Sequence, residues 1–391
     1  MAALGDMAAR GNMAALGAAI RDAFLIDPGA CTVNHGSYGA TPRVVLGEQD
    51  RWRATMEAQT SRFFNRVLPG ALREAAGRLA VHVGAAAEDL AFVPNATTGA
   101  NAVLRSLDFA PGDEILMLSH VYGAVRNTAR HVAARTGARL VEAALPWPRP
   151  DDAAILASIA GAISPRTRLA VLDHITSPSA VIVPIRELVT LCHERGVRVL
   201  VDGAHAPGQI PLDVAAIGAD WYTGNAHKWL FAPKGCAFLH ARPEAQAGLH
   251  PAVISHGLDK GFLAEFDWTG TIDPSAYLAI GAALDFHAAL GGEALMQRNA
   301  AMAAAASARL AERVGTETGH GNGVCGAMAA VRIPGVGTNE TALALRGRLM
   351  DAGCDAPVHA LDDALWLRIS AQAYNEATDF ERLGEILRTV L

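Results

Sequence analysis

The sequence predicts an α/β fold in which a mostly parallel β-sheet is flanked by helices and followed by a smaller α+β C-terminal lobe. Short apolar runs alternate with segments of helical periodicity along the first two thirds of the chain. This alternation is typical of strand–helix–strand units with right-handed crossovers. Polar residues follow several predicted strands directly, and open parallel sheets bind their ligands at the carboxyl ends of their strands. We therefore expect a ligand site at that edge of the sheet.

With 391 residues, 51% of them apolar, the chain can bury a large core and divide into two domains. We expect an N-terminal segment over residues 1–50 that packs on the small lobe. A large domain with the binding site is expected over 51–290, and a small C-terminal domain over 291–391. The Ala-rich first residues are interpreted as a helical lead-in.

Charge and cysteine content exclude several classes of function. The net charge is −6 and no basic run occurs, so no nucleic-acid partner is expected. The five cysteines include no Cys-x-x-Cys pair, which argues against a metal site and favours a reducing compartment. Neither a membrane-spanning apolar run nor a signal-peptide core is present, so we expect a cytoplasmic protein with no membrane partner.

Apolar periodicity and turn residues predict the elements in chain order. The expected order is a loop over 33–42, helices over 43–59 and 70–83 with a loop over 61–66 between them, a strand over 90–94, a helix over 102–107, strands over 113–119 and 168–175, a helix over 183–195, strands over 197–201 and 235–240, a polar loop over 266–274, a helix from 275, a helix over 292–314, a strand over 328–333, a helix over 339–352, a strand over 365–369 and a helix from 379.

The segment Asn95-Ala-Thr-Thr-Gly-Ala-Asn101 follows a predicted buried strand and leads into a helix. A helix start presents free backbone N–H groups and the positive end of the helix dipole, which together bind phosphate. The alternative is an ordinary N-cap, in which Asn or Thr closes the helix. Asn95, Tyr122, His174, Asp202 and Thr223 are all expected just past strand ends, so their side chains should converge.

Lys228 is the second unusual feature, because the chain has three lysines and 30 of its 33 basic residues are arginine. Arginine cannot lose its proton, whereas a desolvated lysine can, and can then form a Schiff base. Trp229, Leu230 and Phe231 follow it and predict partial burial. The alternative is a surface charge without a chemical role.

A phosphate cradle, an aromatic residue, an aspartate at a strand end and a lysine together indicate a site for pyridoxal 5′-phosphate. Tyr122 would stack on the ring, Asp202 would hold the pyridine nitrogen protonated, and Lys228 would bind the aldehyde. His205 could reach the ring hydroxyl, and Arg368 could bind a substrate carboxylate through its bidentate fork. Each residue alone has a structural alternative, as a turn residue, a core histidine or a paired arginine.

Two motifs resemble those of the class V aminotransferase family of fold type I, and in particular its isopenicillin N epimerase-like branch. They are Val201-Asp-Gly-Ala-His-Ala-Pro-Gly208 and Thr223-Gly-Asn-Ala-His-Lys-Trp229. The resemblance covers nearly the whole chain and includes Asn34-His-Gly-Ser-Tyr-Gly39, Asn95-Ala-Thr-Thr-Gly99, Trp268-Thr-Gly-Thr271 and Leu367-Arg-Ile-Ser-Ala-Gln-Ala-Tyr-Asn375. It implies the PLP-dependent transferase fold type I, with pyridoxal 5′-phosphate as cofactor.

The resemblance also implies a role for individual residues. Lys228 would be the Schiff-base lysine, Asp202 would lie at the pyridine nitrogen, His205 at the ring oxygen and Tyr122 on the ring. The phosphate would be held by Thr97 and Thr98, with Thr223 or Asn225 and His227. Thr271 would come from a partner subunit, which implies a homodimer. Arg368 would bind the substrate carboxylate, with Asn34 and His35 lining the pocket.

The residues leave the reaction open, because one cofactor supports several reactions at Cα. The resemblance favours an amino-acid epimerase, which needs a proton carrier opposite Lys228, either Tyr122 or His35. The alternatives are a carbon–sulfur lyase acting on a cysteine conjugate or sulfoxide, an aminotransferase, and a catalytically silent cofactor-binding protein. A cysteine desulfurase would need a nucleophilic cysteine, and Cys354 is interpreted instead as a packed residue.

Overall fold

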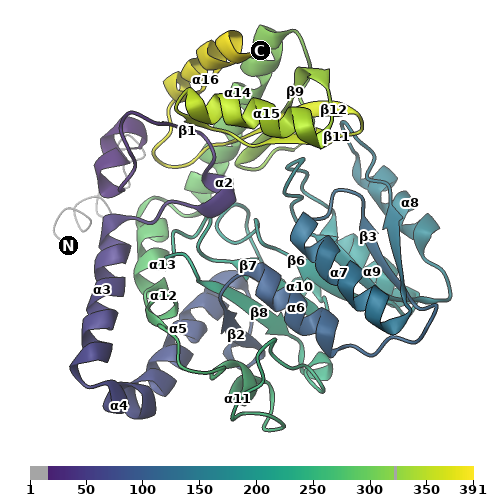
Figure 1. Cartoon of the computed structure of the whole chain (residues 1–391). Coiled ribbons are helices and arrows are strands. Elements are labelled where there is room, and N and C mark those ends of the chain that lie inside the picture. The colour runs from purple at the N-terminus through teal and green to yellow at the C-terminus, as the bar shows by residue number, and fades with distance from the viewer. Residues whose placement is uncertain (1–15, 321–323) are drawn as a thin grey trace.

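A computed structural model of the protein describes residues 16–320 and 324–391. Its larger part is built on a seven-stranded sheet (Figure 1). In spatial order the strands are β2 (Leu90–Val93), β8 (Ala237–Ala241), β7 (Trp221–Asn225), β6 (Arg198–Asp202), β5 (Thr167–Asp173), β3 (Glu114–Leu118) and β4 (Arg139–Ala143). Strand β8 is antiparallel to both neighbours, and the other neighbouring strands are parallel. The predicted mostly parallel sheet is confirmed.

Helices bury both faces of this sheet. Along β3, for example, Leu116 belongs to one hydrophobic cluster and Ile115 to another, because successive side chains point to opposite faces. The cluster that contains Leu116 also receives α3 (Arg43–Ala58), α5 (Leu68–Val83), α8 (Asp152–Ala162), α9 (Ile185–Glu194), α10 (Val214–Ile217), α12 (Ser275–Leu278) and α13 (Ile280–Ala289). The cluster that contains Ile115 receives α6 (Ala96–Ser106), α7 (Gly123–Thr136) and α11 (Phe262–Phe266).

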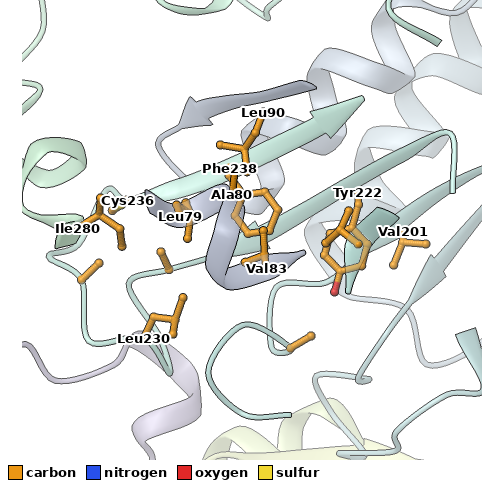
Figure 2. Packing of buried hydrophobic residues seen from close by; sticks show 14 of the residues in the cluster. Leu79, Ala80, Val83, Leu90, Val201, Tyr222, Leu230, Cys236, Phe238 and Ile280 are labelled. Carbon is orange, nitrogen blue, oxygen red and sulfur yellow. The ribbon is translucent and has the colours of Figure 1, made fainter. Parts of the chain in front are cut away.

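Part of the first cluster packs between α5 and strands β2, β7 and β8 (Figure 2). Tyr222 and Phe238 lie on neighbouring strands, with ring centroids 6.1 Å apart and planes at 8°. Leu79 and Val83 of α5 are fully buried against them. This packing supports the strand that leads directly to Lys228.

The C-terminal lobe is a three-stranded antiparallel sheet covered by three helices. Its strands, in spatial order, are β11 (Val358–Leu361), β12 (Ala364–Ser370) and β9 (Met328–Val336), and its helices are α14 (Glu293–Val314), α15 (Asn339–Asp351) and α16 (Ala377–Val390). Leu365, Leu367 and Ile369 of β12 face these helices. The intervening residues Trp366 and Arg368 therefore face the larger part of the molecule.

The first described residues lie against this lobe (Figure 1). The 3-10 helix η2 (Gly17–Ala23) contacts it through the Gly17 N–H, which donates to the Ala373 carbonyl at 2.7 Å. Strand β1 (Cys31–Thr32) then pairs in parallel with β10 (Cys354–Asp355). The Ala-rich lead-in over residues 1–15 lies outside the described residues.

Several predictions about local structure were wrong. The expected loop over 33–42 contains the short helix α2 (His35–Tyr38), and the expected loop over 61–66 forms α4 (Thr60–Arg62) and the π-helix η3 (Phe63–Val67). Helix α6 begins at Ala96 rather than Ala102, because the Asn95 side chain accepts a hydrogen bond from the Thr98 N–H and caps it there. The periodicity also missed β4, an edge strand whose residues are largely part-exposed, and the helix α8 that follows it.

Two further 3-10 helices are η4 (Ala87–Asp89) and η5 (Pro243–Ala245). Among the described residues, no single helix combines the length and apolar composition needed to cross a membrane. Two consecutive helical segments, Ser275–Ala289 and Glu293–Val314, meet both requirements only when they are counted together, and the chain bends sharply between them.

Leu367→Ala should lower the free energy of unfolding by about 3 kcal/mol, because it leaves a cavity at a site with no solvent access in the small lobe. The matched control is Leu343→Ala on α15, where the side chain is 68% exposed and the expected change is within about 0.5 kcal/mol. Urea unfolding followed by circular dichroism measures both. Equal effects in the two variants would contradict the packing described for β12.

Candidate active site

A cavity of about 490 Å³ lies at the carboxyl ends of β5, β6 and β7, and Lys228 lines it. Its size falls in the range of small-molecule and cofactor sites. Seven of the residues predicted from the sequence line it: Thr97, Tyr122, Asp202, His205, Asn225, His227 and Lys228. Of the five side chains expected to converge, Asn95, Tyr122 and Asp202 line the cavity, whereas His174 and Thr223 do not.

Lys228 lies in the turn after β7, following Ala226 and His227, and is 8% exposed. Its Nζ lies 3.1 Å from Nε2 of His205. Burial, and after it the positive charge of Arg368, lowers the pKa of the Lys228 amine to about 7, although Asp202 opposes the shift. An amine with this pKa is largely able to act as a nucleophile near neutral pH.

Two buried carboxyl groups end adjacent strands. Asp173 is the last residue of β5 and Asp202 the last residue of β6, and the two are direct partners in the ladder. Burial raises the pKa of both, and the negative charge of Asp202 raises that of Asp173 further. Oδ2 of Asp173 and Nδ1 of His205 are buried without a hydrogen-bond partner among the described residues. Sequence reasoning chose His174 and missed Asp173, although Asp173 ends its strand as Asp202 does.

The start of α6 forms a polar wall of the cavity. Oδ1 of Asn225 accepts a hydrogen bond from the Ala96 N–H at 2.9 Å, and Thr97 lines the cavity beside it. The N–H and hydroxyl of Thr98 both donate to Oδ1 of Asn95, at 2.8 and 3.1 Å. The cap predicted as the alternative is therefore present, on a helix whose N-terminus faces the cavity.

Two of the expected phosphate ligands point elsewhere. Thr223 lies inside β7, fully buried, and its hydroxyl donates to the Phe238 carbonyl at 2.9 Å. Thr98 lines a neighbouring apolar pocket, and its hydroxyl is already bound to Asn95. Of the predicted set, Thr97, Asn225 and His227 line the cavity. Nδ1 of His227 lies 3.0 Å from the Cys236 carbonyl, which fixes the orientation of its ring.

Arg368 is 2% exposed and is held by neutral oxygen atoms from two other segments. Its Nη1 donates to the Ser177 carbonyl at 2.6 Å, and its Nη2 donates to Oγ of Ser37 at 2.9 Å and Oδ1 of Asn34 at 3.2 Å. No carboxylate forms an ion pair with this guanidinium among the described residues. Ser37 and Ser177 also line the cavity. Ser37 belongs to the motif over residues 34–39 but is not among the predicted site residues, and no motif marks Ser177.

Asn34 and His35 have supporting contacts. Nδ2 of Asn34 donates to Asp355 at 3.0 Å, which leaves its Oδ1 for Arg368. Nδ1 of His35 lies 3.0 Å from the Tyr374 hydroxyl, and Nε2 lies 3.0 Å from the Lys228 carbonyl. Both nitrogens of His35 are engaged and the side chain is 3% exposed, so the hypothesis that it carries a substrate proton is wrong.

Two other residues from the sequence hypotheses lie away from the cavity lining. Thr271 is exposed on the loop before α12 and is not among the residues that line the cavity. Cys354 is 1% exposed in β10, opposite Cys31 of β1, which confirms that it is a packed residue. The hydrogen bond with Cys31, and after it burial, raises the pKa of the Cys354 thiol, so it lacks the exposed thiolate of a reactive cysteine.

The residues that line the cavity fit pyridoxal 5′-phosphate. A helix N-terminus with Thr97 suits the phosphate, an exposed tyrosine ring suits stacking, and buried carboxyl groups suit the pyridine nitrogen. The unpartnered Nδ1 of His205 and Oδ2 of Asp173 are polar atoms that still need a partner. Lys228 supplies a buried amine for the aldehyde.

Comparison with known proteins gives the family. The sequence pattern of the family described as "Aminotransferase class-V" matches residues 50–383, so the chain belongs to the class-V aminotransferase family and is a PLP-dependent enzyme. Isopenicillin N epimerase from Amycolatopsis lactamdurans is 35% identical over 392 residues, covering 94% of this chain and 97% of that protein. A putative L-cysteine desulfhydrase from Oryza sativa subsp. japonica is 36% identical over 405 residues, covering 93% and 84%.

Solved structures agree on the fold. The cystine C-S lyase C-DES, in complex with its product cysteine persulfide, superposes with a TM-score of 0.79 at 21% identity, covering 92% of this chain and 97% of that one. The cysteine desulfurase CsdA from Escherichia coli gives a TM-score of 0.77 at 18% identity, covering 97% and 98%. The predicted PLP-dependent transferase fold type I is confirmed.

Lys228→Ala should abolish the visible absorbance of a lysine-linked cofactor, because it removes the amine that binds the aldehyde. The phosphate contacts would remain, so the cofactor should still bind reversibly. Lys260→Ala, at an exposed position, is the control and should retain the absorbance. The absorption spectrum of each purified variant mixed with pyridoxal 5′-phosphate decides the point, and an unchanged spectrum in Lys228→Ala would exclude this lysine.

The rate at which cofactor-free enzyme binds pyridoxal 5′-phosphate covalently should rise with pH through about 7 and then level off. Below that pH the Lys228 amine is protonated and cannot attack, since its pKa is lowered to about 7. Stopped-flow absorbance over a pH series measures this rate. A midpoint near the ordinary lysine value of about 10.4 would contradict the desolvation described for Lys228.

Proposed function

We propose that this enzyme moves a proton at Cα of an amino acid whose carboxylate is bound by Arg368, and that the net reaction is epimerisation. The proposal depends on the presence of two basic groups in one site. Lys228 is a buried amine with a pKa lowered to about 7, and Arg368 forms no ion pair with an acid among the described residues. One group can transfer a proton, and the other can bind an α-carboxylate beside it. Together they define the two ends of a bound amino acid.

Arg368 presents a preorganised guanidinium. Ser177, Ser37 and Asn34 hold its two terminal nitrogens, so little side-chain entropy is lost when a carboxylate binds. All three partners are neutral, so the positive charge is left for the substrate. Burial, and next the positive charge of Arg346, lowers the pKa of Arg368 to about 10, and the group stays charged at neutral pH.

Lys228 would take and return the Cα proton, while Asp202 would face the cofactor nitrogen. When bound, pyridoxal 5′-phosphate supplies the electron sink that makes this proton acidic. Epimerisation requires a second proton carrier on the opposite face of Cα. With His35 excluded, Tyr122 is the remaining candidate: it lines the cavity, and its side chain is 44% exposed and able to move a proton to water.

A carbon–sulfur lyase is the second candidate, favoured by the single well-placed base and by the relatives named as L-cysteine desulfhydrases. Removal of a β-sulfur group needs only Lys228 at Cα and no proton from the opposite face. A cysteine nucleophile is not needed either, which agrees with the burial of Cys354. Aminotransfer is a third outcome of the same proton movements.

We also propose that the enzyme works as a homodimer in which Thr271 reaches the partner's cofactor site. Thr271 is exposed, and apolar side chains near it are exposed too, with Ile272 at 46% and Val253 at 58%. Val253, Ile272 and Trp268 line one apolar pocket that a second chain would cover. An apolar surface of this kind marks an interface.

The test is to incubate the holoenzyme in heavy water with a panel of L-amino acids and cysteine conjugates. Deuterium at Cα with formation of the D-isomer and no pyruvate is the expected result. Pyruvate from cysteine or a cysteine conjugate, with or without sulfide, would overturn epimerisation in favour of the lyase. A 2-oxo acid that keeps the side chain of its substrate would indicate aminotransfer. Nuclear magnetic resonance and chiral chromatography follow the products together.

Tyr122→Phe should separate the two faces of Cα. The variant keeps the aromatic ring but loses the phenol, so deuterium exchange at Cα of the L-isomer should persist while D-isomer formation falls by about 100-fold, the lower range for loss of a general acid. Ser119→Ala, at the end of the preceding strand, is a control that changes a hydroxyl outside the cavity. An unchanged rate of D-isomer formation would exclude Tyr122 as the second proton carrier.

A further inference from the structure

Strands β11 and β12 present a row of polar side chains to the larger part of the molecule. Trp366 and Arg368 are two residues apart on β12, so they share one face of the sheet. His359 of β11 pairs directly with Trp366, which places its side chain on that same face. The row therefore continues from the proposed carboxylate-binding arginine to a histidine further along the lobe.

These side chains carry hydrogen-bond donors that have no acceptor. Nε1 of Trp366, Nε of Arg368 and Nε of Arg346 are buried and unpartnered among the described residues, and so are Nε2 of His359 and Nε1 of Trp147. Trp366 and Arg368 are each 2% exposed, so bulk water does not satisfy these groups. Buried donors that lack acceptors are costly, and the missing partner must be an acceptor.

The charges around this row are mostly positive. Arg346 lies on α15, which packs against β11. It forms no ion pair or hydrogen bond with any other described residue, and its positive charge adds to the effect of burial in lowering the pKa of both Arg368 and His359. Of the nearby acids, Asp355 accepts a hydrogen bond from Asn34 and Asp362 is exposed at the turn between β11 and β12. A negatively charged group with several hydrogen-bond acceptors would satisfy the unpaired donors and would be attracted by the positive charges around them.

The row adjoins the reaction cavity. Ser177, which accepts a hydrogen bond from Arg368, lines that cavity. The ring of Trp147 lies 4.7 Å from that of Trp366 and 5.5 Å from that of His120, whose Nδ1 lies 3.0 Å from Oγ of Ser179. The paired indoles therefore bridge the small lobe to the loop that follows β5, next to Ser177.

We propose that Arg346, His359 and the paired indoles of Trp147 and Trp366 form a subsite for a second anionic group of the substrate. The inference rests on the proposed function, in which Arg368 binds the α-carboxylate. It names the substrate class: an amino acid whose side chain ends in a carboxylate or a comparable anion. Cysteine has no such group and would leave these donors unpaired.

The experiment titrates the holoenzyme with amino acids and follows the absorbance of the bound cofactor. The probes are L-aspartate, L-glutamate and L-2-aminoadipate, each compared with the neutral amino acid of equal carbon number: L-2-aminobutyrate, L-norvaline and L-norleucine. At least one acid should bind about tenfold more tightly than its neutral counterpart, the gain expected from one charge-assisted hydrogen bond. Arg346→Gln should remove that preference and leave the affinity for the neutral amino acid unchanged.

Two further variants keep the test specific. Arg348→Gln changes an exposed arginine on the same helix, whose Nε donates to the Val390 carbonyl at 2.9 Å, and it should retain the preference. His359→Gln should reduce the preference, because it removes the imidazole whose Nε2 is buried without a partner on the same face of the sheet as Trp366. Circular dichroism verifies that each variant is folded.

The outcomes separate this inference from the function on which it rests. If neutral and acidic amino acids bind equally at every length, or if Arg346→Gln weakens both alike, the subsite is overturned while the proposed chemistry at Cα stands. If no amino acid changes the cofactor spectrum or exchanges its Cα proton, the proposed function fails and the subsite fails with it.

Discussion

The parallel pairing of β5, β6 and β7 is the constraint on which the rest of the site depends. In-register pairing ends Asp173 and Asp202 at the same level, and β7 continues beside them into the turn that carries Lys228. A slip of one residue would turn each carboxyl group to the opposite face of the sheet. The apolar clusters on both faces prevent such a slip, because each strand fits its two faces in only one register. Core packing thus sets the distances on which the chemistry relies.

Patterns within short stretches of sequence predicted the order of strands and helices and several residues of the candidate site. The strand–helix alternation gave the parallel sheet, and the strand-ending Asp202 and the isolated Lys228 gave the cofactor site. Contacts between distant segments could not be predicted in this way. Ser37 and Ser177 bind Arg368 from two different regions of the chain. Ser37 lies in the motif over residues 34–39, but neither that motif nor the residues around Ser177 indicate a contact with Arg368. His35 was misjudged for the same reason, since the partners that engage both of its nitrogens lie 193 and 339 residues away.

Two arginines near the site, Arg368 and Arg346, are not paired with acidic side chains among the described residues. Arg368 is surrounded by neutral oxygen atoms, and Arg346 lies near it without an acid to pair with. Two unneutralised cations in a partly buried setting destabilise the folded chain. An arrangement of this kind is retained where a ligand supplies the missing charge, and substrate binding would then also stabilise the small lobe. Burial, and after it the positive charge of Arg368, lowers the pKa of the Lys228 amine, so substrate recognition and base strength are linked.

The pairing of β1 with β10 affects the order in which the chain can fold during its synthesis. Cys31 and Thr32 leave the ribosome before the strands of the large sheet, and their partners Cys354 and Asp355 leave it after those strands. Asn34 and Ser37 likewise wait for Arg368, more than 330 residues later. The large sheet can assemble during synthesis, whereas the segment around β1 cannot dock until the C-terminal lobe has been made. A nascent chain can therefore build the core of its larger part first, and the contacts of Asn34 and Ser37 with Arg368 form only afterwards.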